Sequence, residues 1–269
     1  RGDAYLDTHT LEKAIPVVTM EQEQAVSDIL REEAKQKMSP FYDVSEDNLK
    51  FKEKAGKYID FLNANAYDKE RDVRTNIAGE FQKSNLAAAL QTAELICGRL
   101  DEDKIYEALS QIRISGRMEE IAPGIIVDVS HNIQGMQGFV QTVEANYHGM
   151  KKRILFAASH QNEEEYMKNI LKTIPEIEAF YTVGIHKRRI DEAEFQDAFR
   201  KMIDRNQETT VCFVVGSFYL AGMAKEFFCN LLGKKCVSFQ RILVLTVEVD
   251  NYNRKGKMNI DNDKRLIFI

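Results

Sequence analysis

The chain has 269 residues, of which 44% are hydrophobic and 29% are charged, so it can form one large domain or two ordinary ones with a proper core. Its formal net charge is −5, with Lys and Arg spread along the chain, which argues against a nucleic-acid or membrane-surface partner. The sequence contains no apolar run of the roughly 18 residues that a transmembrane helix needs, so none is expected.

The four cysteines predict neither a metal site nor an extracellular disulfide framework. Cys97, Cys212, Cys229 and Cys236 lack the short spacing of a zinc knuckle, and no His pair lies near them. We expect them to be reduced and mostly buried, because free Cys is among the most buried residue types. Reduced thiols favour a cytoplasmic protein.

The first 112 residues predict short strands mixed with longer helices. An apolar run at 14–19 (AIPVVT) indicates a buried strand, and helical spacing of apolar residues then predicts a helix at about 21–37. The pair Ser39-Pro40 ends that helix. Further elements are expected as strands near 41–44 and 51–58 and as helices at about 83–100 and 101–112.

From about residue 121, strands alternate regularly with helices. The predicted strands are 124–128, 154–158, 179–183 and 210–215. The predicted helices are 135–147, 163–173, 192–204 and 218–231. This alternation predicts a parallel sheet covered by helices on both faces, with ligands bound at the carboxyl ends of the strands. One more strand candidate, 241–249, lies in an otherwise polar tail.

Three short clusters carry the functional signal: GEFQKSN at 79–85, GRME at 116–119 and DVSHN at 128–132. A fourth pattern, GSFYL at 216–220, follows a predicted strand. Each is short, but their order and spacing together resemble folylpolyglutamate synthase and dihydrofolate synthase of the Mur ligase superfamily. IPVVT at 15–19 also resembles the last part of that family's central ATPase sheet, so the similarity covers about residues 10–228.

The resemblance implies an α/β protein with two domains. Residues 1–116 would be the carboxyl-terminal part of a truncated P-loop-type ATPase domain. Residues 117–231 would form the Rossmann-like, mainly parallel-sheet carboxyl-terminal domain, and 232–269 stay unassigned. The implied enzyme is an ATP- and Mg²⁺-dependent ligase of folate and one-carbon metabolism. It would join L-glutamate to a folate carboxylate through an acyl phosphate, as a cytoplasmic monomer.

The resemblance also implies roles for five residues. Arg117 and His131 would be catalytic, with Arg117 contacting the ATP phosphates from the interdomain linker. Asn85 would contact the nucleotide from the ATPase domain, and Asp128 would accept a hydrogen bond from the ribose or its surroundings. Asn132 would face the same cleft as His131. A fixed guanidinium suits this chemistry because forming an acyl phosphate concentrates negative charge.

Each of these residues also has an alternative interpretation without a ligand. Arg117 could be a solvated linker residue, and His131 a packed or surface histidine. Asp128 or Asn132 could cap the helix that follows, and Asn85 could be a helix cap as well. Capping and ligand contact are compatible with each other.

A phosphate-binding loop of the usual kind is missing from the sequence. Such a loop ends in Gly-Lys followed by Ser or Thr, whereas the Gly-Lys pairs at 56–58, 233–235 and 256–258 are followed by Tyr, Lys and Met. We expect that loop and the Mg²⁺ ligands in an amino-terminal part outside this chain, so the chain alone should not be active. The alternatives are a fragment of a UDP-muramoyl-peptide ligase and a non-catalytic nucleotide- or partner-binding module.

Overall fold

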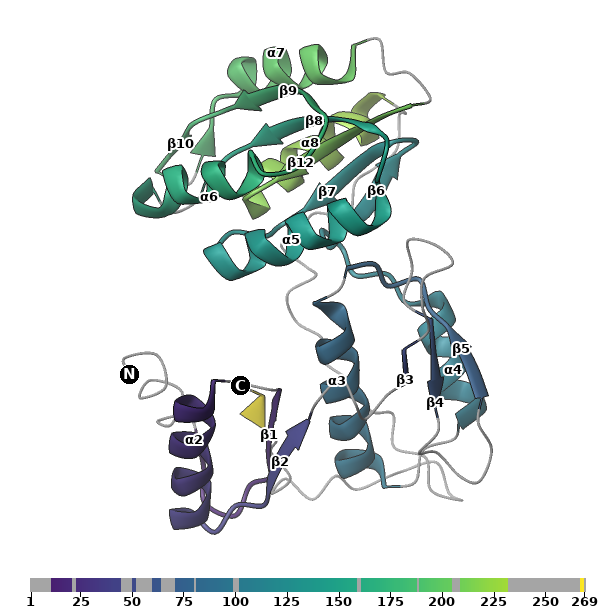
Figure 1. Cartoon of the computed structure of the whole chain (residues 1–269), viewed down its shortest axis with the longest axis vertical. Coiled ribbons are helices and arrows are strands. Elements are labelled where there is room, and N and C mark those ends of the chain that lie inside the picture. Colours follow the sequence, from purple (N-terminus) through teal and green to yellow (C-terminus); the bar gives the residue numbers. More distant parts are fainter. Residues whose placement is uncertain are drawn as a thin grey trace.

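The computed structural model describes residues 11–20, 23–44, 50–51, 60–63, 71–79, 81–98, 102–158, 161–187, 189–204, 209–231 and 267–268. Their elements fall into an amino-terminal region with two small sheets and a carboxyl-terminal region built on a five-stranded sheet (Figure 1).

The first small sheet is parallel and centres on β1 (Val17–Met20). On one side β1 pairs with β2 (Phe41–Val44), to which α2 (Gln24–Gln36) connects it, and on the other with β13 (Ile267–Phe268). The predicted strand at 14–19 therefore begins three residues late. Ala14 adopts a φ of 61° and donates its N–H to the carbonyl of Lys37, so it forms a turn rather than a strand.

The remaining elements of the amino-terminal region are three antiparallel strands and two helices. They are β3 (Lys50–Phe51), β4 (Asp60–Asn63), β5 (Arg71–Arg74), α3 (Gln82–Cys97) and α4 (Glu102–Gln111). A core of seven buried hydrophobic residues joins β1 and β2 to the two helices: Val18, Val44, Ile77, Leu86, Ala87, Ala88 and Leu109. This packing fixes the amino-terminal end of α3 close to the end of β1.

The five-stranded sheet has the order β6-β7-β12-β8-β9. Its strands are β6 (Glu119–Ala122), β7 (Ile125–Asp128), β8 (Lys151–Phe156), β9 (Ile177–Thr182) and β12 (Thr210–Val215). The last four run parallel, as predicted, whereas β6 is an unpredicted antiparallel edge strand. Because β12 enters between β7 and β8, their carboxyl ends lie together at one edge, where ligands bind in open α/β sheets.

Helices cover both faces of this sheet (Figure 1). They are α5 (Ile133–Asn146), α6 (Glu164–Leu171), α7 (Glu192–Ile203) and α8 (Phe218–Leu231). Side chains alternate along the strands, so Phe213 of β12 packs in the core under α5 and α6, while Val214 packs under α7 and α8. A 3₁₀ turn (Gln161–Glu163) and a hairpin of β10 (Ile185–His186) and β11 (Arg189–Ile190) complete this region.

Two predictions need comment. The strand candidates at 241–249 and most of 51–58 lie outside the described residues. The expectation of reduced cysteines holds for Cys212, whose buried thiol is reduced, but is wrong for Cys229, which is disulfide-bonded. Because Cys229 is not reduced, the cysteines no longer support a cytoplasmic location.

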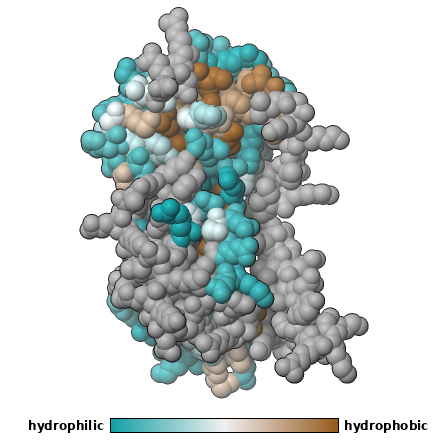
Figure 2. All heavy atoms as spheres, turned by 90° about the vertical axis from the view of Figure 1, so that its right-hand side faces the viewer, coloured by the Kyte–Doolittle hydropathy of each residue, from teal (hydrophilic) through white to brown (hydrophobic). Residues whose placement is uncertain are grey.

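Surface polarity differs along the molecule. On the face drawn in Figure 2, exposed hydrophobic residues gather over the region of the five-stranded sheet, and the described residues at the level between the two regions are mainly hydrophilic. Among the described residues, no helix combines the length and the apolar character that a membrane span requires.

Candidate functional site at the junction of the two regions

The turn after β7 presents the DVSHN cluster at the edge of the sheet. Asn132 caps α5, because its side-chain Oδ1 accepts the Gly135 N–H at 2.7 Å. A Cβ built on Gly135 would lie 2.9 Å from that Oδ1, so a larger residue would disturb the cap. The amino-terminal end of α5 is thereby fixed beside His131, whose Nδ1 lies 3.0 Å from the Val129 carbonyl. The His131 ring also contacts Phe218, with the ring centroids 5.4 Å apart.

Asp128 is buried and turned toward the chain itself. Its Oδ1 accepts hydrogen bonds from the Ser130 backbone N–H at 2.8 Å and the Ser130 hydroxyl at 2.6 Å. Its Oδ2 accepts the Met118 N–H at 2.9 Å. Burial raises the pKa of the Asp128 carboxyl, and the bonds from Ser130, the charge of Arg117 and the Met118 bond oppose that rise. Asp128 therefore joins the linker to the sheet.

The GRME cluster forms a tight turn that presents Arg117. Gly116 and Met118, on either side of Arg117, both have positive φ values, 72° and 47°. The Arg117 backbone N–H donates to the Ile114 carbonyl at 3.2 Å. The Arg117 guanidinium lies over the ring of Phe81, with Cζ 5.8 Å from the ring centroid, so the linker residue contacts the start of α3.

The GEFQKSN cluster opens α3 toward this turn. Asn85 is exposed and donates a hydrogen bond from Nδ2 to Oε1 of the buried Gln82 at 2.9 Å. Phe81 bridges to the other region, since a Cβ on Gly138 of α5 would lie only 3.1 Å from its ring. Figure 1 shows the same approach, with α5 along the lower border of the carboxyl-terminal region and the end of α3 directly below it.

These elements enclose a cleft of about 430 Å³ between β1 and α3 on one side and the turn from β7 to α5 on the other. The residues that line it are Met20, Phe81, Ser84, Asn85, Arg117, Ser130, His131, Asn132, Gln134 and Gly135. Four of the five residues named from the sequence are among them: Asn85, Arg117, His131 and Asn132. Asp128 does not line the cleft but lies behind its wall.

Several cleft residues were not predicted. Met20, Gln134 and Gly135 lie outside the three sequence clusters, and no short motif marks them as cleft residues. Phe81 and Ser84 lie within the GEFQKSN cluster, so its position at the start of a helix was the one available signal. Within the described part of the chain, no group of three or more His, Cys, Asp or Glu side chains is placed to hold a metal ion.

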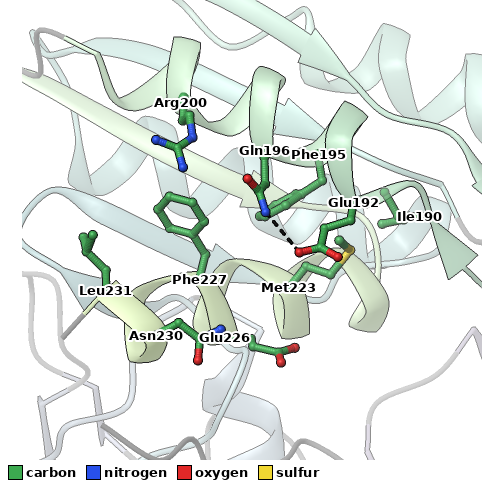
Figure 3. Close-up of a pocket in the computed structure, with 10 residues that line it drawn as sticks. All are labelled: Ile190, Glu192, Phe195, Gln196, Arg200, Met223, Glu226, Phe227, Asn230 and Leu231. Carbon is green, nitrogen blue, oxygen red and sulfur yellow. Dashed lines mark hydrogen bonds between the residues drawn. The ribbon is translucent and has the colours of Figure 1, made fainter. Parts of the chain in front are cut away.

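A second hollow of about 440 Å³ lies between α7 and α8 (Figure 3). Phe195, Phe227 and Met223 form much of its lining, and Arg200 lies over the Phe227 ring with Cζ 5.4 Å from the centroid. Gln196 donates to Glu192 at 3.0 Å, so polar groups drawn at its rim are engaged with each other. None of the residues named from the sequence motifs lines this hollow.

The fold is that of an α/β protein with a mainly parallel central sheet covered by helices. More particularly, the chain is 23% identical over 174 residues to the dihydrofolate synthase/folylpolyglutamate synthase of Bacillus subtilis (strain 168). That match includes 61% of this chain and 40% of the relative. The resemblance to the folylpolyglutamate synthase family is thereby confirmed, although no family model matches the chain.

Solved structures agree with this fold. Folylpolyglutamate synthetase from Lactobacillus casei superposes with a TM-score of 0.66 at 21% identity, covering 86% of this chain and 58% of that one. Folylpolyglutamate synthase from Thermotoga maritima gives 0.65 at 20% identity, covering 84% and 57%. A complex described as FPGS with AMPPCP and folate gives 0.68 at 21%, covering 86% and 56%. The chain thus spans little more than half the length of these structures.

Proposed function

We propose that this chain supplies the carboxyl-terminal side of the nucleotide cleft in a ligase that uses ATP to join L-glutamate to a folate. The main support is that one cleft is lined by four residues from separate parts of the sequence: Asn85, Arg117, His131 and Asn132. The folate-synthase relative and the similar structure described as an AMPPCP-folate complex support this ligand class.

The cleft has the chemistry that a nucleotide's phosphates need. Arg117 brings a guanidinium into it, and a planar guanidinium binds phosphate oxygens through two parallel hydrogen bonds. The amino-terminal end of α5, at Gln134 and Gly135, forms part of the wall, and a helix amino terminus favours negative charge. These groups fit ATP, which would supply the phosphoryl group that activates the folate carboxylate.

The other cleft residues would contact different parts of the ligands, according to the region from which they come. Asn85 and Ser84, from α3, would contact the nucleotide, and His131 and Asn132 would face the substrates across it. The Asn132 cap and a ligand contact are compatible, because a carboxamide also carries an N–H₂ group. Contact between Asp128 and ATP stays a prediction, and its three hydrogen bonds favour a supporting role behind Arg117.

Mg²⁺ and the phosphate-binding loop are not assigned to residues of this chain. Catalysis is therefore proposed for a protein or assembly that also supplies the loop, and the 269-residue chain alone is expected to release no ADP. A cytoplasmic location and a monomeric state remain predictions on the same family basis.

Nucleotide binding by the chain itself tests the proposal. Isothermal titration with AMPPCP should show binding that Arg117→Ala weakens by about 10-fold or more, because the variant loses a charge-assisted contact. Arg117→Lys should restore it partly, since Lys lacks the planar fork. The melting temperature should stay unchanged, because a linker side chain holds little of the core together.

Arg113 is a matched control, since it is an exposed arginine four residues earlier that does not line the cleft. Arg113→Ala should bind AMPPCP like the wild type. Equal binding by Arg117→Ala, or no binding by the wild-type chain, would contradict the proposal. Thermal protection by UDP-sugars but not by folates would favour a UDP-muramoyl-peptide ligase instead.

A further inference from the structure

The glutamate of the GRME cluster has a contact set of its own. Glu119 begins β6, and its Oε2 accepts the Gly116 N–H at 2.7 Å and the Ser115 hydroxyl at 3.0 Å. Lys225, in α8, reaches both carboxylate oxygens of Glu119, at 2.9 and 3.0 Å, and lies 2.6 Å from the Ser115 Oγ. A helix more than a hundred residues away is thus bonded directly to the linker turn.

Two carboxylates therefore hold the backbone on both sides of Arg117. Glu119 binds the N–H of the residue before it, and Asp128 binds the N–H of the residue after it. The Gly116 carbonyl is engaged as well, because it accepts the Val129 N–H at 2.8 Å. The peptide groups that flank Arg117 are fixed to β6, to β7 and to the turn that carries the cleft residues.

This turn needs outside support. Met118 has a φ of 47°, and a non-glycine residue in the left-handed region is strained because its Cβ crowds the backbone. Such a conformation persists where surrounding contacts over-determine it. The Lys225–Glu119 pair suits that task, since its side chains are only 19% and 27% exposed and so are screened less by salt than a surface pair.

We propose that Lys225 and Glu119 are positioning residues, which clamp the turn 115–118 so that the Arg117 guanidinium is held in the cleft. This inference rests on the proposed nucleotide role of Arg117. It assigns the glutamate of the motif to the linker rather than to a ligand, and it makes α8 part of the site's support.

Hydrogen exchange of the full chain tests the clamp without any ligand. In Lys225→Met and in Glu119→Gln, the amides of residues 114–119 should exchange at least about 10-fold faster than in the wild type, because the Gly116 N–H loses its anchored acceptor. Lys168→Met is the matched control. Lys168 also forms an ion pair, with Glu164, and its side chain is 21% exposed, close to the value for Lys225. This pair lies on α6, away from the linker.

The control should leave exchange at 114–119 unchanged, and Lys225→Arg should restore protection. Wild-type exchange at 114–119 in both clamp variants would overturn the inference. The two clamp variants change different residues. If one of them fails to fold, hydrogen exchange in the other still tests the clamp. A fall in melting temperature with unchanged local exchange would assign the pair to stability alone.

A double-mutant cycle shows whether the clamp acts through Arg117. Lys225→Met should weaken AMPPCP binding about 5-fold in the wild-type background and cause no further loss in the Arg117→Ala background. An equal loss in both backgrounds would overturn positioning through Arg117. If the wild-type chain binds no nucleotide, the proposed function fails, and the exchange experiment still decides on the clamp.

Discussion

The two ends of the parallel sheet hold their polar groups in different ways. At the amino ends, Lys152 pairs with Glu176 at 2.8 Å and Arg153 with Glu178 at 2.7 Å, so charges are neutralised within the chain. At the carboxyl ends, the buried carboxyl group of Asp128 accepts hydrogen bonds from Ser130 and Met118, and neighbouring polar groups face the cleft. Paired charges stabilise a fold, whereas groups left facing a cleft are available to a ligand.

The largest expected effect on stability is at the carboxyl ends, where the backbone conformation leaves no room for a side chain. Gly216 follows β12 with a φ of 111°, and a Cβ there would lie 2.6 Å from the Ala157 carbonyl oxygen. Gly216→Ala should lower the free energy of unfolding by about 4 kcal/mol, combining backbone strain with overpacking. Urea unfolding curves would measure this loss.

Gly222, in the middle of α8, is the control for that substitution. A Cβ there meets no atom within 4 Å, so Gly222→Ala should raise stability by about 0.5 to 1 kcal/mol through helix propensity. A loss below 1 kcal/mol for Gly216→Ala would show that the strand end can relax, and would weaken the contrast between the two ends.

An effect of about 3 kcal/mol is expected at the amino ends. The Lys152 side chain is fully buried, and Lys152→Ala removes its stem from the core as well as its ion pair. Lys152→Met should cost clearly less, since it keeps most of the stem and its partner Glu176 is 47% exposed. Neither variant should change AMPPCP binding, and a change would contradict the division of roles between the ends.

A smaller effect of about 2 kcal/mol is expected for Asp128→Asn, because an amide N–H₂ would face the Met118 or Ser130 donor. The folded-state pKa of Asp128 lies above its usual 3.8, so its contribution to stability is present below that pH and is lost as pH rises through the folded value. The advantage of the wild type over Asp128→Asn should therefore shrink as pH rises from about 3.8.

The amino ends should respond to pH in the opposite direction. The hydrogen bond from Lys152 lowers the pKa of Glu176 below its usual 4.5, so its contribution is present above that pH and is lost as pH falls through the folded value. The advantage of the wild type over Glu176→Gln should shrink as the solution is acidified. Unfolding curves for both pairs of proteins between pH 3 and 7, about the range in which carboxyls titrate, would compare the ends, and equal pH trends would contradict the contrast.

Much of the fold followed from sequence periodicity. The bounds of β12 and α8 match their predictions, since a continuous apolar strand ends at Gly216 and a helix opens after Ser217. β6 was missed because its four residues begin with two glutamates and form a partly exposed antiparallel edge, which looks like linker sequence. α5 begins at Ile133, two residues before its prediction, because Asn132 supplies the cap.

The members of the site were easier to predict than their arrangement. Motif order named Asn85, Arg117 and His131, all of which line the cleft. Motif order does not distinguish residues of the cleft wall from residues behind it: Asp128 accepts hydrogen bonds from the chain behind the wall, and its contact with ATP stays a prediction. That distinction depends on burial and on contacts between distant segments, which a single sequence does not encode locally.

The Phe81 ring, which lines the cleft, lies against Gly138 of α5 where the two regions meet. Because Gly138 has no side chain, the Phe81 ring can lie directly against α5, and a single added methyl group would have to push that ring aside. The absence of a side chain at position 138 therefore allows this close packing. Alanine at position 138 would require the Phe81 ring to give way by a few tenths of an ångström, so the packing between the two regions could be changed beside the cleft while every polar group of the cleft keeps its identity.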